Sequence, residues 1–322
     1  MAKRKSNRPK AGWLSGLLVA LAFVAGLVGY QMGWWTPDTP AAGTASPTAS
    51  PVAPAITLSP DAAPDGALAA GEAEAVFIDV GQGDSILLTN GSAHVLVDAG
   101  DEGMGPVVLA ELQRRGIDKL DLVVASHPHA DHIGGLDEVL ARIPAEQVFL
   151  PEVSSNSVSF ERLLTVIEDK QLPVHTPTPG ETWERAGLRL TFLGPDAQAD
   201  YDNLNDWSIL LRLDTDHGSL LLTGDAEGPA ENAALDAGLP LQADVLKVGH
   251  HGSKTSTRQK FLQAVAPQAA VISVGAGNDY GHPTQTILDR LAEAGVQVFR
   301  TDTQGTITCR FSREGIVITT NK

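Results

Sequence analysis

Short apolar runs separated by glycine-containing turns begin near residue 74 and continue almost to the C-terminus. Their residues are largely Val, Ile, Leu and Phe, and such runs between turn residues are typical of β-strands. The pattern predicts strands in AVFIDV, SILLT, HVLVDAG, LDLVVAS, QVFL, LRLTFL, WSILLRL, SLLLTGD, ADVLKV, AAVISV, VQVFR and ITCRF.

Helical patterns lie between several of these runs, because apolar residues there recur every three or four positions. They predict helices over 105–115, 135–143, 159–170, 227–237, 258–265 and 284–294. Strand-rich halves that are each interleaved with helices favour a two-sheet α/β sandwich over a single doubly wound sheet.

The N-terminus has a different pattern. Residues 1–10 carry five basic side chains and no acidic one, and residues 11–35 carry no charge over 25 positions. That stretch is long enough to span a bilayer, and its positive flank is expected to stay in the cytoplasm. The alternative is a secretory signal peptide cleaved near the sequence AAG at 41–43. Residues 1–35 are therefore an anchor or a signal, and both place the rest of the chain outside the cytoplasm.

Residues 36–73 are rich in Pro, Ala, Ser and Thr and contain no aromatic residue. Such a composition cannot build a core, and its prolines predict an extended, semi-stiff linker. Residues 74–322 are the predicted folded domain, held off the membrane surface by this linker.

Charge and cysteine content narrow the function of that domain. After residue 35, 18 basic residues remain against 39 acidic ones. This excess opposes loose binding of nucleic acid, which normally needs a basic face. Cys309 is the single cysteine, which excludes an internal disulfide and a thiolate metal cluster. Its position in the run ITCRF indicates simple packing.

Four side chains of metal-ligand type lie within six residues directly after the run LDLVVAS: His127, His129, Asp131 and His132. A loop leaving a buried strand can direct the first two to one metal ion and the last two to a neighbouring ion. The two glycines that follow would let the backbone turn tightly into a helix. A chance cluster of polar surface residues is the alternative, and this density of ligands after a strand disfavours it.

The sequence HPHADHIGG resembles the HxHxDH signature of the metallo-β-lactamase superfamily. The runs FIDVGQGDSILL, LLLTGD, DVLKVGHHGS and YGHPT further resemble the exported hydrolase domain of ComEC-type competence proteins and their free-standing relatives. This likeness covers residues 74–319 and does not include the polytopic channel of a competence protein. It implies a four-layer αββα sandwich that binds two divalent metal ions, with zinc as first choice and manganese as second.

The resemblance also assigns roles to acidic residues and to a pair of histidines. Asp225, which ends SLLLTGD, would bridge the two ions. Asp98, which ends HVLVDAG, would hydrogen-bond to the histidine loop, and a turn at a strand end is the alternative for it. Either His250 or His251 would complete the second ion's ligands, and their spacing leaves the choice open.

The third histidine of the superfamily pattern has no counterpart before LLLTGD, where residues 202–208 read DNLNDWS. The ComEC-like branch is similar in having asparagine there. Asn205 would donate its carbonyl oxygen to the first ion or position the substrate. Because an amide oxygen is a poorer zinc ligand than imidazole, we expect weaker occupancy of the first site and competition from manganese.

The segment FIDVGQGDSILL contains Gly81-Gln82-Gly83-Asp84, which on local pattern predicts a tight hairpin turn. The resemblance places this turn beside the metal pocket. There Asp79, Gln82 and Asp84 would support a ligand histidine, bound water or substrate.

Two further polar segments precede predicted helices. Ser253, Lys254 and Ser256 would hold a phosphate oxygen, with capping of the helix as the alternative. His282, in YGHPT, is the candidate for protonating the leaving group or gripping the phosphate. The remaining histidines are expected to be ordinary surface or strand-edge residues: His94, His175 and His217.

These features predict an extracytoplasmic hydrolase that cleaves phosphodiester bonds, in DNA or another phosphate ester, with metal-activated hydroxide. Asp131 would orient the attacking water or accept its proton. One alternative is a metal-binding interaction domain without turnover, and another is a hydrolase of lactones, thioesters or β-lactams. The missing third histidine disfavours β-lactam hydrolysis. Apart from a substrate and the membrane, no partner is indicated.

Overall fold

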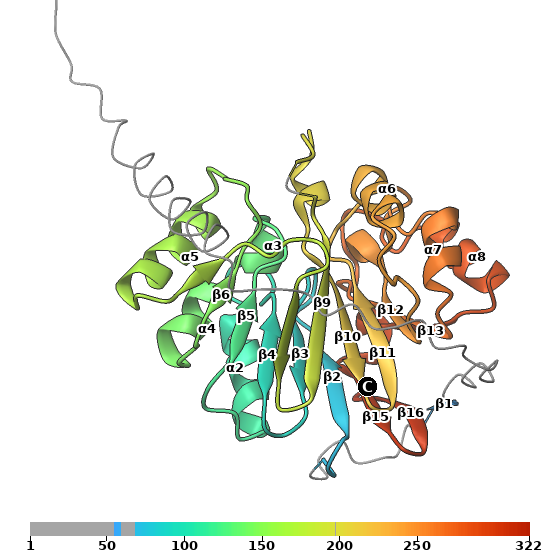
Figure 1. The fold of residues 1–322 in the computed structure, drawn as a ribbon, viewed down its shortest axis with the longest axis horizontal. Helices are drawn as coiled ribbons and strands as arrows, with labels where there is room; N and C mark the ends of the chain where they lie inside the picture. The colour runs from blue at the N-terminus through green and yellow to red at the C-terminus, as the bar shows by residue number, and fades with distance from the viewer. Residues whose placement is uncertain (1–54, 59–67, 197) are drawn as a thin grey trace, which may run out of the picture. The chain divides into compact units, whose positions relative to one another are not determined.

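Two β-sheets lie face to face in the computed structural model, which describes residues 55–58, 68–196 and 198–322 (Figure 1). The first sheet runs from edge to edge through β1 (Ile56–Leu58), β16 (Gly315–Thr320), β15 (Ile307–Ser312), β2 (Ala73–Phe77), β3 (Ile86–Thr89), β4 (His94–Val97), β5 (Leu122–Val124), β6 (Val148–Phe149) and β7 (Val174–His175). The second runs through β14 (Gln297–Arg300), β13 (Ala269–Ile272), β12 (Val245–Lys247), β11 (Gly218–Leu222), β10 (Leu210–Thr215), β9 (Leu188–Gly194) and β8 (Thr182–Arg185).

Helices cover the outer face of each sheet (Figure 1). The strands β4 to β7 and β11 to β14 are parallel, and parallel neighbours need crossover connections, which these helices supply. The first sheet carries α2 (Gly105–Arg114), α4 (Leu136–Arg142) and α5 (Val158–Asp169), and the second carries α6 (Gly228–Asp236), α7 (Gln259–Val265) and α8 (Gln285–Glu293). Shorter turns are α3 (Ala130–Ile133), α9 (Thr301–Gln304) and the 3-10 helices η1 (Leu204–Trp207) and η2 (Gly249–Gly252).

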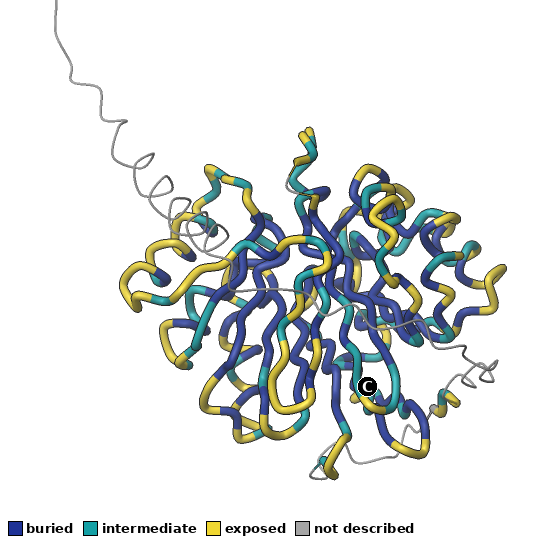
Figure 2. Tube along the Cα trace, in the orientation of Figure 1, coloured by how far each residue is buried: buried dark blue, intermediate teal, exposed yellow. Residues whose placement is uncertain are grey.

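The apolar residues separate into three cores because successive side chains of a strand point to opposite faces. Phe77 faces the space between the sheets, whereas its neighbour Val76 packs with the helices of the first sheet. Figure 2 shows the resulting buried strands, with exposed residues gathered on loops and outer helix faces. The described fold is therefore a mixed α/β sandwich with helices outside both sheets, as predicted.

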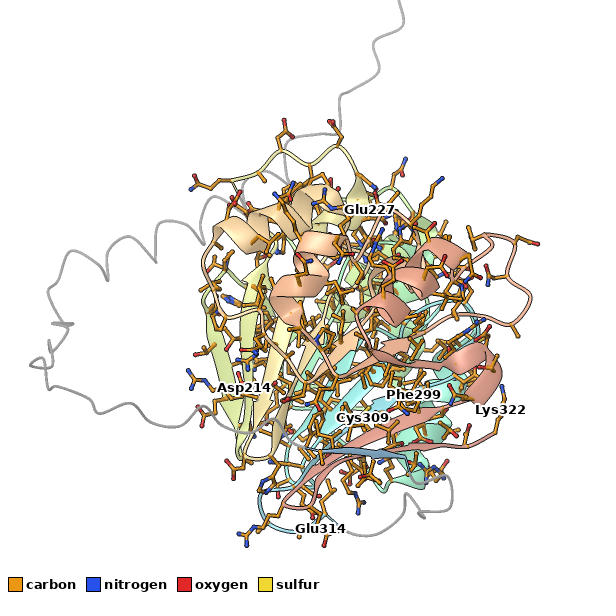
Figure 3. The ribbon with its side chains drawn as sticks, turned by 90° about the vertical axis from the view of Figure 1, so that its right-hand side faces the viewer. Asp214, Glu227, Phe299, Cys309, Glu314 and Lys322 are labelled. Atoms are coloured by element: carbon orange, nitrogen blue, oxygen red, sulfur yellow. The ribbon has the colours of Figure 1, made fainter. Side chains whose placement is uncertain are left out.

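The expected elements are present with small shifts at their ends. Each of the predicted strand runs contains a strand, and each of the six predicted helices is found. Sequence analysis missed β16, together with the edge strands β1, β7 and β8. Cys309 is fully buried in the core between the sheets, to which Phe299 also belongs, in agreement with its predicted packing role, and burial raises the pKa of its thiol (Figure 3).

The strand β1 lies within the segment predicted as a linker. It pairs in parallel with β16, so that Ile56 lies opposite Ile316 and Leu58 opposite Ile318. Part of the linker thus joins the edge of the first sheet. The predicted membrane span at 11–35 lies outside the described residues, and within the described ones no helix has the length and apolar character to cross a bilayer.

Candidate metal centre

The predicted ligand loop leaves β5 and enters α3 at one edge of the sandwich, where Asp98 fixes it from the neighbouring parallel strand β4. The carboxylate of Asp98 accepts the backbone N–H of Ser126 at 2.7 Å and the Nδ1–H of His132 at 2.8 Å. Asp98 is buried and has a φ of 60°, a conformation that costs energy for a residue other than glycine. The predicted hydrogen bond from Asp98 to the histidine loop is therefore present.

The glycines after the ligand loop have a different function from the predicted one. Gly134 and Gly135 have ordinary negative φ values of −62° and −96°. A Cβ at either position would lie 2.4 Å from the backbone of the segment after β4, at Glu102 N or Ala99 O. Close approach of two backbones, rather than a turn, requires glycine there.

Four residues form what we call the tight group: Asp131, His132, Asp225 and His251. Their potential ligand atoms all lie within 4.8 Å of one another. His132 Nε2 is 3.3 Å from Asp225 Oδ1, and His251 Nε2 is 3.2 Å from Asp131 Oδ2. The Nδ1–H of His251 donates to Ser273 O at 2.8 Å, which leaves Nε2 directed at the carboxylates.

Four other residues form a looser set, the open group: His127, His129, Asn205 and His250. His127 Nε2 lies 3.0 Å from His129 Nδ1 and 4.0 Å from Asp225 Oδ2. His250 Nε2 lies 3.7 Å from the same Asp225 oxygen. Asp225, which follows β11, is thus within 4 Å of members of both groups.

The backbone of η2 explains how two consecutive histidines reach one pocket. Both His250 and His251 adopt left-handed conformations, with φ of 48° and 52°. These conformations place His251 in the tight group and His250 in the open group, a division that spacing alone left undecided.

Several polar atoms of this site are buried without a hydrogen-bond partner. They are His132 Nε2, Asp225 Oδ1 and Asn205 Oδ1. Leaving such atoms unpaired is costly, and a cation bound between them would satisfy the oxygens and take the place of a proton on the His132 nitrogen. The residues present therefore fit a divalent metal ion.

The electrostatics of the centre agree with this fit. Burial opposes ionisation of Asp225, yet the positive charges of His251 and His132 hold the pKa of its carboxyl well below the usual range. Burial lowers the pKa of His127 well below its usual value, so this imidazole is neutral and able to coordinate. Concentrated carboxylates thus attract positive charge to this point.

Two charged residues of the centre were missed by sequence analysis. Lys247, at the end of β12, is fully buried; it pairs with Asp84, donates to Gly224 O at 2.9 Å, and lies 3.8 Å from Asp225. Glu227 accepts hydrogen bonds from His250 at 2.9 Å and from Asn205 at 3.3 Å. The sequence signal that could have revealed Lys247 is a single positively charged residue within an apolar strand. No comparable signal in the sequence marks Glu227.

The loop 78–85 is a long connection between β2 and β3, not the tight hairpin turn of the local prediction. Asp84 is buried and donates its backbone N–H to Asp131 O, so the loop does lie beside the pocket. Gln82 also lines it. The carboxylate of Asp79 has other partners than those predicted: it pairs with Lys322 and accepts a backbone N–H within its own turn.

The residues Ser253, Lys254 and Ser256 before α7 lie outside the lining of the pocket. Ser256 is buried and donates its hydroxyl to Ala226 O, and Ser253 bonds to Thr255. Lys254 is exposed and lies outside the residues that line the pocket. The capping alternative is wrong, since α7 begins after Arg258 without a side-chain cap.

The pocket over the centre has a volume of about 330 Å³. His282 lines it, and its Nδ1 is buried without a partner. The other lining residues are Gln82, His129, Ala130, Asp131, Asn205, Asp225, His250, His251 and Tyr280. The histidines expected to be ordinary, His94, His175 and His217, lie outside this lining.

The sequence profile of the metallo-beta-lactamase superfamily matches residues 78–276, which include the ligand loop, Asp225 and both histidines of η2. The chain belongs to the metallo-β-lactamase superfamily. Within this superfamily, the predicted resemblance to competence proteins is also confirmed. The chain is 33% identical over 260 residues to ComE operon protein 3 of Bacillus subtilis (strain 168), covering 74% of this chain and 33% of that protein.

Further relatives and structures agree. The chain is 31% identical over 252 residues to competence protein ComA of Neisseria gonorrhoeae, covering 78% of this chain and 34% of ComA. The chain spans about a third of the length of each of these two relatives.

Solved structures show the same fold. The metallo-β-lactamase fold protein YhfI of Bacillus subtilis matches with a TM-score of 0.50 at 11% identity, over 74% of this chain and 99% of YhfI. The diiron β-hydroxylase CmlA of Streptomyces venezuelae matches with a TM-score of 0.50 at 14% identity, over 74% of this chain and 54% of CmlA. At such identities, the structures show the fold alone.

Proposed function

We propose that this superfamily member is an extracytoplasmic hydrolase of phosphodiester bonds that uses two divalent metal ions. The observation that carries the proposal is the tight group: His132 Nε2 and Asp225 Oδ1 are buried without a hydrogen-bond partner, and Asp131, Asp225 and His251 line an open pocket together with His282. An apolar binding site would not collect four ionisable side chains at this density.

The two groups of side chains define the proposed ligand sets. Asp131, His132, Asp225 and His251 would hold one ion, while His127, His129 and Asp225 would hold the other, with His250 or the Asn205 oxygen beside it. Zinc suits the imidazoles, and manganese competes at the set that contains the amide oxygen. Divalent ions so held supply Lewis acidity and lower the pKa of bound water towards neutrality.

The chain's own residues then orient the reaction. The Asp131 carboxylate would accept a hydrogen bond from the attacking water and orient it. An N–H of the His282 imidazole donates to a non-bridging or leaving phosphate oxygen in the pocket.

Several observations favour a phosphodiester over other substrates. The Neisseria gonorrhoeae relative is named a competence protein, and a Haemophilus influenzae protein that is 31% identical over 249 residues is named a recombination protein; both names refer to processes that act on DNA. The acidic domain opposes prolonged contact with a long polyanion, so a short or single-stranded stretch fits better. Asparagine at position 205 disfavours β-lactams.

The proposed location rests on the basic N-terminus and the uncharged stretch 11–35. With that stretch as an anchor, protease added to intact cells cuts the linker and releases the domain. Release only after the cells are permeabilised would show that the orientation is wrong.

Turnover by the purified full-length protein tests the activity. Substrates are bis-p-nitrophenyl phosphate, single-stranded DNA and a cephalosporin, each with zinc or manganese. We expect metal-dependent cleavage of the two phosphodiesters and none of the cephalosporin. Stoichiometric metal binding without turnover would refute the proposal and support a non-catalytic interaction domain.

A further inference from the structure

Tyr280 lies at the mouth of the metal pocket in an unusual setting for a large ring. Its side chain is 70% exposed, yet it lines the same cavity as Asp225, His250 and His251. Among the large apolar side chains that are exposed in the described residues, it is the one aromatic. An open aromatic ring beside a polar reaction site offers a flat binding face.

The loop that carries Tyr280 is held by one side chain, Asn278. Its Oδ1 accepts the backbone N–H groups of Tyr280 at 3.2 Å and of His282 at 3.0 Å. Its Nδ2 donates to Gly275 O at 3.0 Å and to His282 O at 2.7 Å. The ring is therefore presented on a braced turn, which reduces the entropy that a ligand must overcome on binding.

The ring also has a defined relation to the reaction site. It lies nearly parallel to His282, with centroids 6.0 Å apart and planes inclined by 21°. His282 in turn contacts His250 edge-on, with centroids 5.6 Å apart. A group stacked on Tyr280 would thus lie one ring away from the imidazole proposed to hold the phosphate.

We propose that Tyr280 is a stacking platform for the nucleobase that adjoins the scissile phosphodiester. This inference rests on the proposed function and specifies its substrate as base-bearing. Stacking needs no positive charge, which suits a domain with 18 basic against 39 acidic residues after residue 35. Because a base in a duplex has both faces covered, the substrate presents an unpaired base, in a single strand or a dinucleotide.

Kinetics with matched diesters test the platform. The first substrate is a thymidine dinucleotide, and the second replaces the base next to the phosphate by an abasic sugar. We expect Tyr280→Ala to raise KM for the dinucleotide about 10-fold or more, and to leave KM for the abasic diester unchanged. Tyr280→Phe should retain the low KM, and Val158→Ala, at an exposed apolar residue outside the pocket lining, is the control.

A binding measurement separates this inference from the proposed hydrolysis. The fluorescence of 2-aminopurine riboside 5′-monophosphate should be quenched when this nucleotide binds to the metal-loaded full-length protein. The substitution Tyr280→Ala should abolish the quenching. Quenching without turnover of either diester would support the platform and refute the hydrolysis. Equal effects of Tyr280→Ala on both diesters, or unchanged quenching, would overturn the platform. A further rise in affinity with a longer single strand would identify a polynucleotide rather than a small nucleotide.

Discussion

The two halves of the metal centre differ in how the chain builds them. In the tight group, His132 and His251 are fully buried, and each has a ring N–H fixed by Asp98 or Ser273. In the open group, His250 keeps 25% of its side chain exposed and is held by Glu227. The difference teaches that the tight group is preorganised, whereas under the proposed two-ion function the open group would leave room for exchange and for substrate.

The two groups also differ in the type and the spacing of their potential ligand atoms. Among the described residues, no group of three or more His, Cys, Asp or Glu that contains His127 or His129 has all its ligand atoms within 4.8 Å of one another, as the tight group does. Asn205 supplies an amide oxygen where imidazole would bind zinc better. We therefore propose that the open group would be the weaker of the two ion sites.

The largest expected effect is common to both halves. His127→Ala in the open group and Asp131→Ala in the tight group should each lower metal-dependent turnover about 1000-fold, because each removes an ion ligand. Circular dichroism should show an intact fold. His94→Ala, outside the pocket, is the control, and an equal loss from all three variants would indicate a structural cause.

The substitution Lys247→Met, beside the tight group, should strongly lower the free energy of unfolding of the protein. It leaves the Asp84 carboxylate buried without its partner, a change worth about 3–5 kcal/mol of unfolding free energy. Urea unfolding of the metal-free protein measures this value. The double variant with Asp84→Asn should recover most of the loss, and a single variant as stable as the parent would contradict the buried pair.

Asp98→Asn should weaken metal binding about 10- to 100-fold, because the amide no longer fixes His132 as a charged acceptor does. The loss should fall on the stronger of two titrated affinities. Loss of the weaker affinity alone would reverse the assignment of the two groups.

Glu227→Gln is the matching change on the open side and should have a smaller effect. An amide oxygen still accepts the His250 N–H, so we expect a loss of about 10-fold at the weaker affinity only. Titration of metal-free protein with zinc checks it. A change at the stronger affinity would show that the two halves are not separate.

Sequence reasoning worked where signals were local. The apolar runs and helical periods predicted the sandwich, and the HPHADH segment named four side chains that the fold brings to one edge. Asp98 was also placed correctly, because the ends of parallel neighbours β4 and β5 meet at that edge.

Prediction from the sequence failed where contacts between segments far apart in the chain determine the position or the role of a side chain. Ser256 resembled a helix cap, yet its hydroxyl bonds to Ala226 across the fold. The division of His250 and His251 depends on two left-handed residues that spacing cannot reveal. Glu227 acts through His250 and Asn205, which come from other segments, so no local pattern marked it.

An effect no larger than that of Glu227→Gln, but of opposite sign, is expected from restoring an imidazole to the open group. Asn205→His should tighten zinc binding at the weaker site about 10-fold, because histidine nitrogen is a better zinc donor than an amide oxygen. Turnover need not rise, since an extra nitrogen ligand can fill the open coordination position. Unchanged affinity would show that position 205 does not reach the ion.

Calorimetric titration of the metal-free, full-length protein with zinc tests the central contrast most directly. The unmodified protein should show two sites of clearly unequal affinity, the stronger one lost in His251→Ala and the weaker one selectively tightened in Asn205→His. Two sites of equal, high affinity in the unmodified protein would contradict the account, because another residue, such as Asp202 or Asn203, would then have to complete the open group.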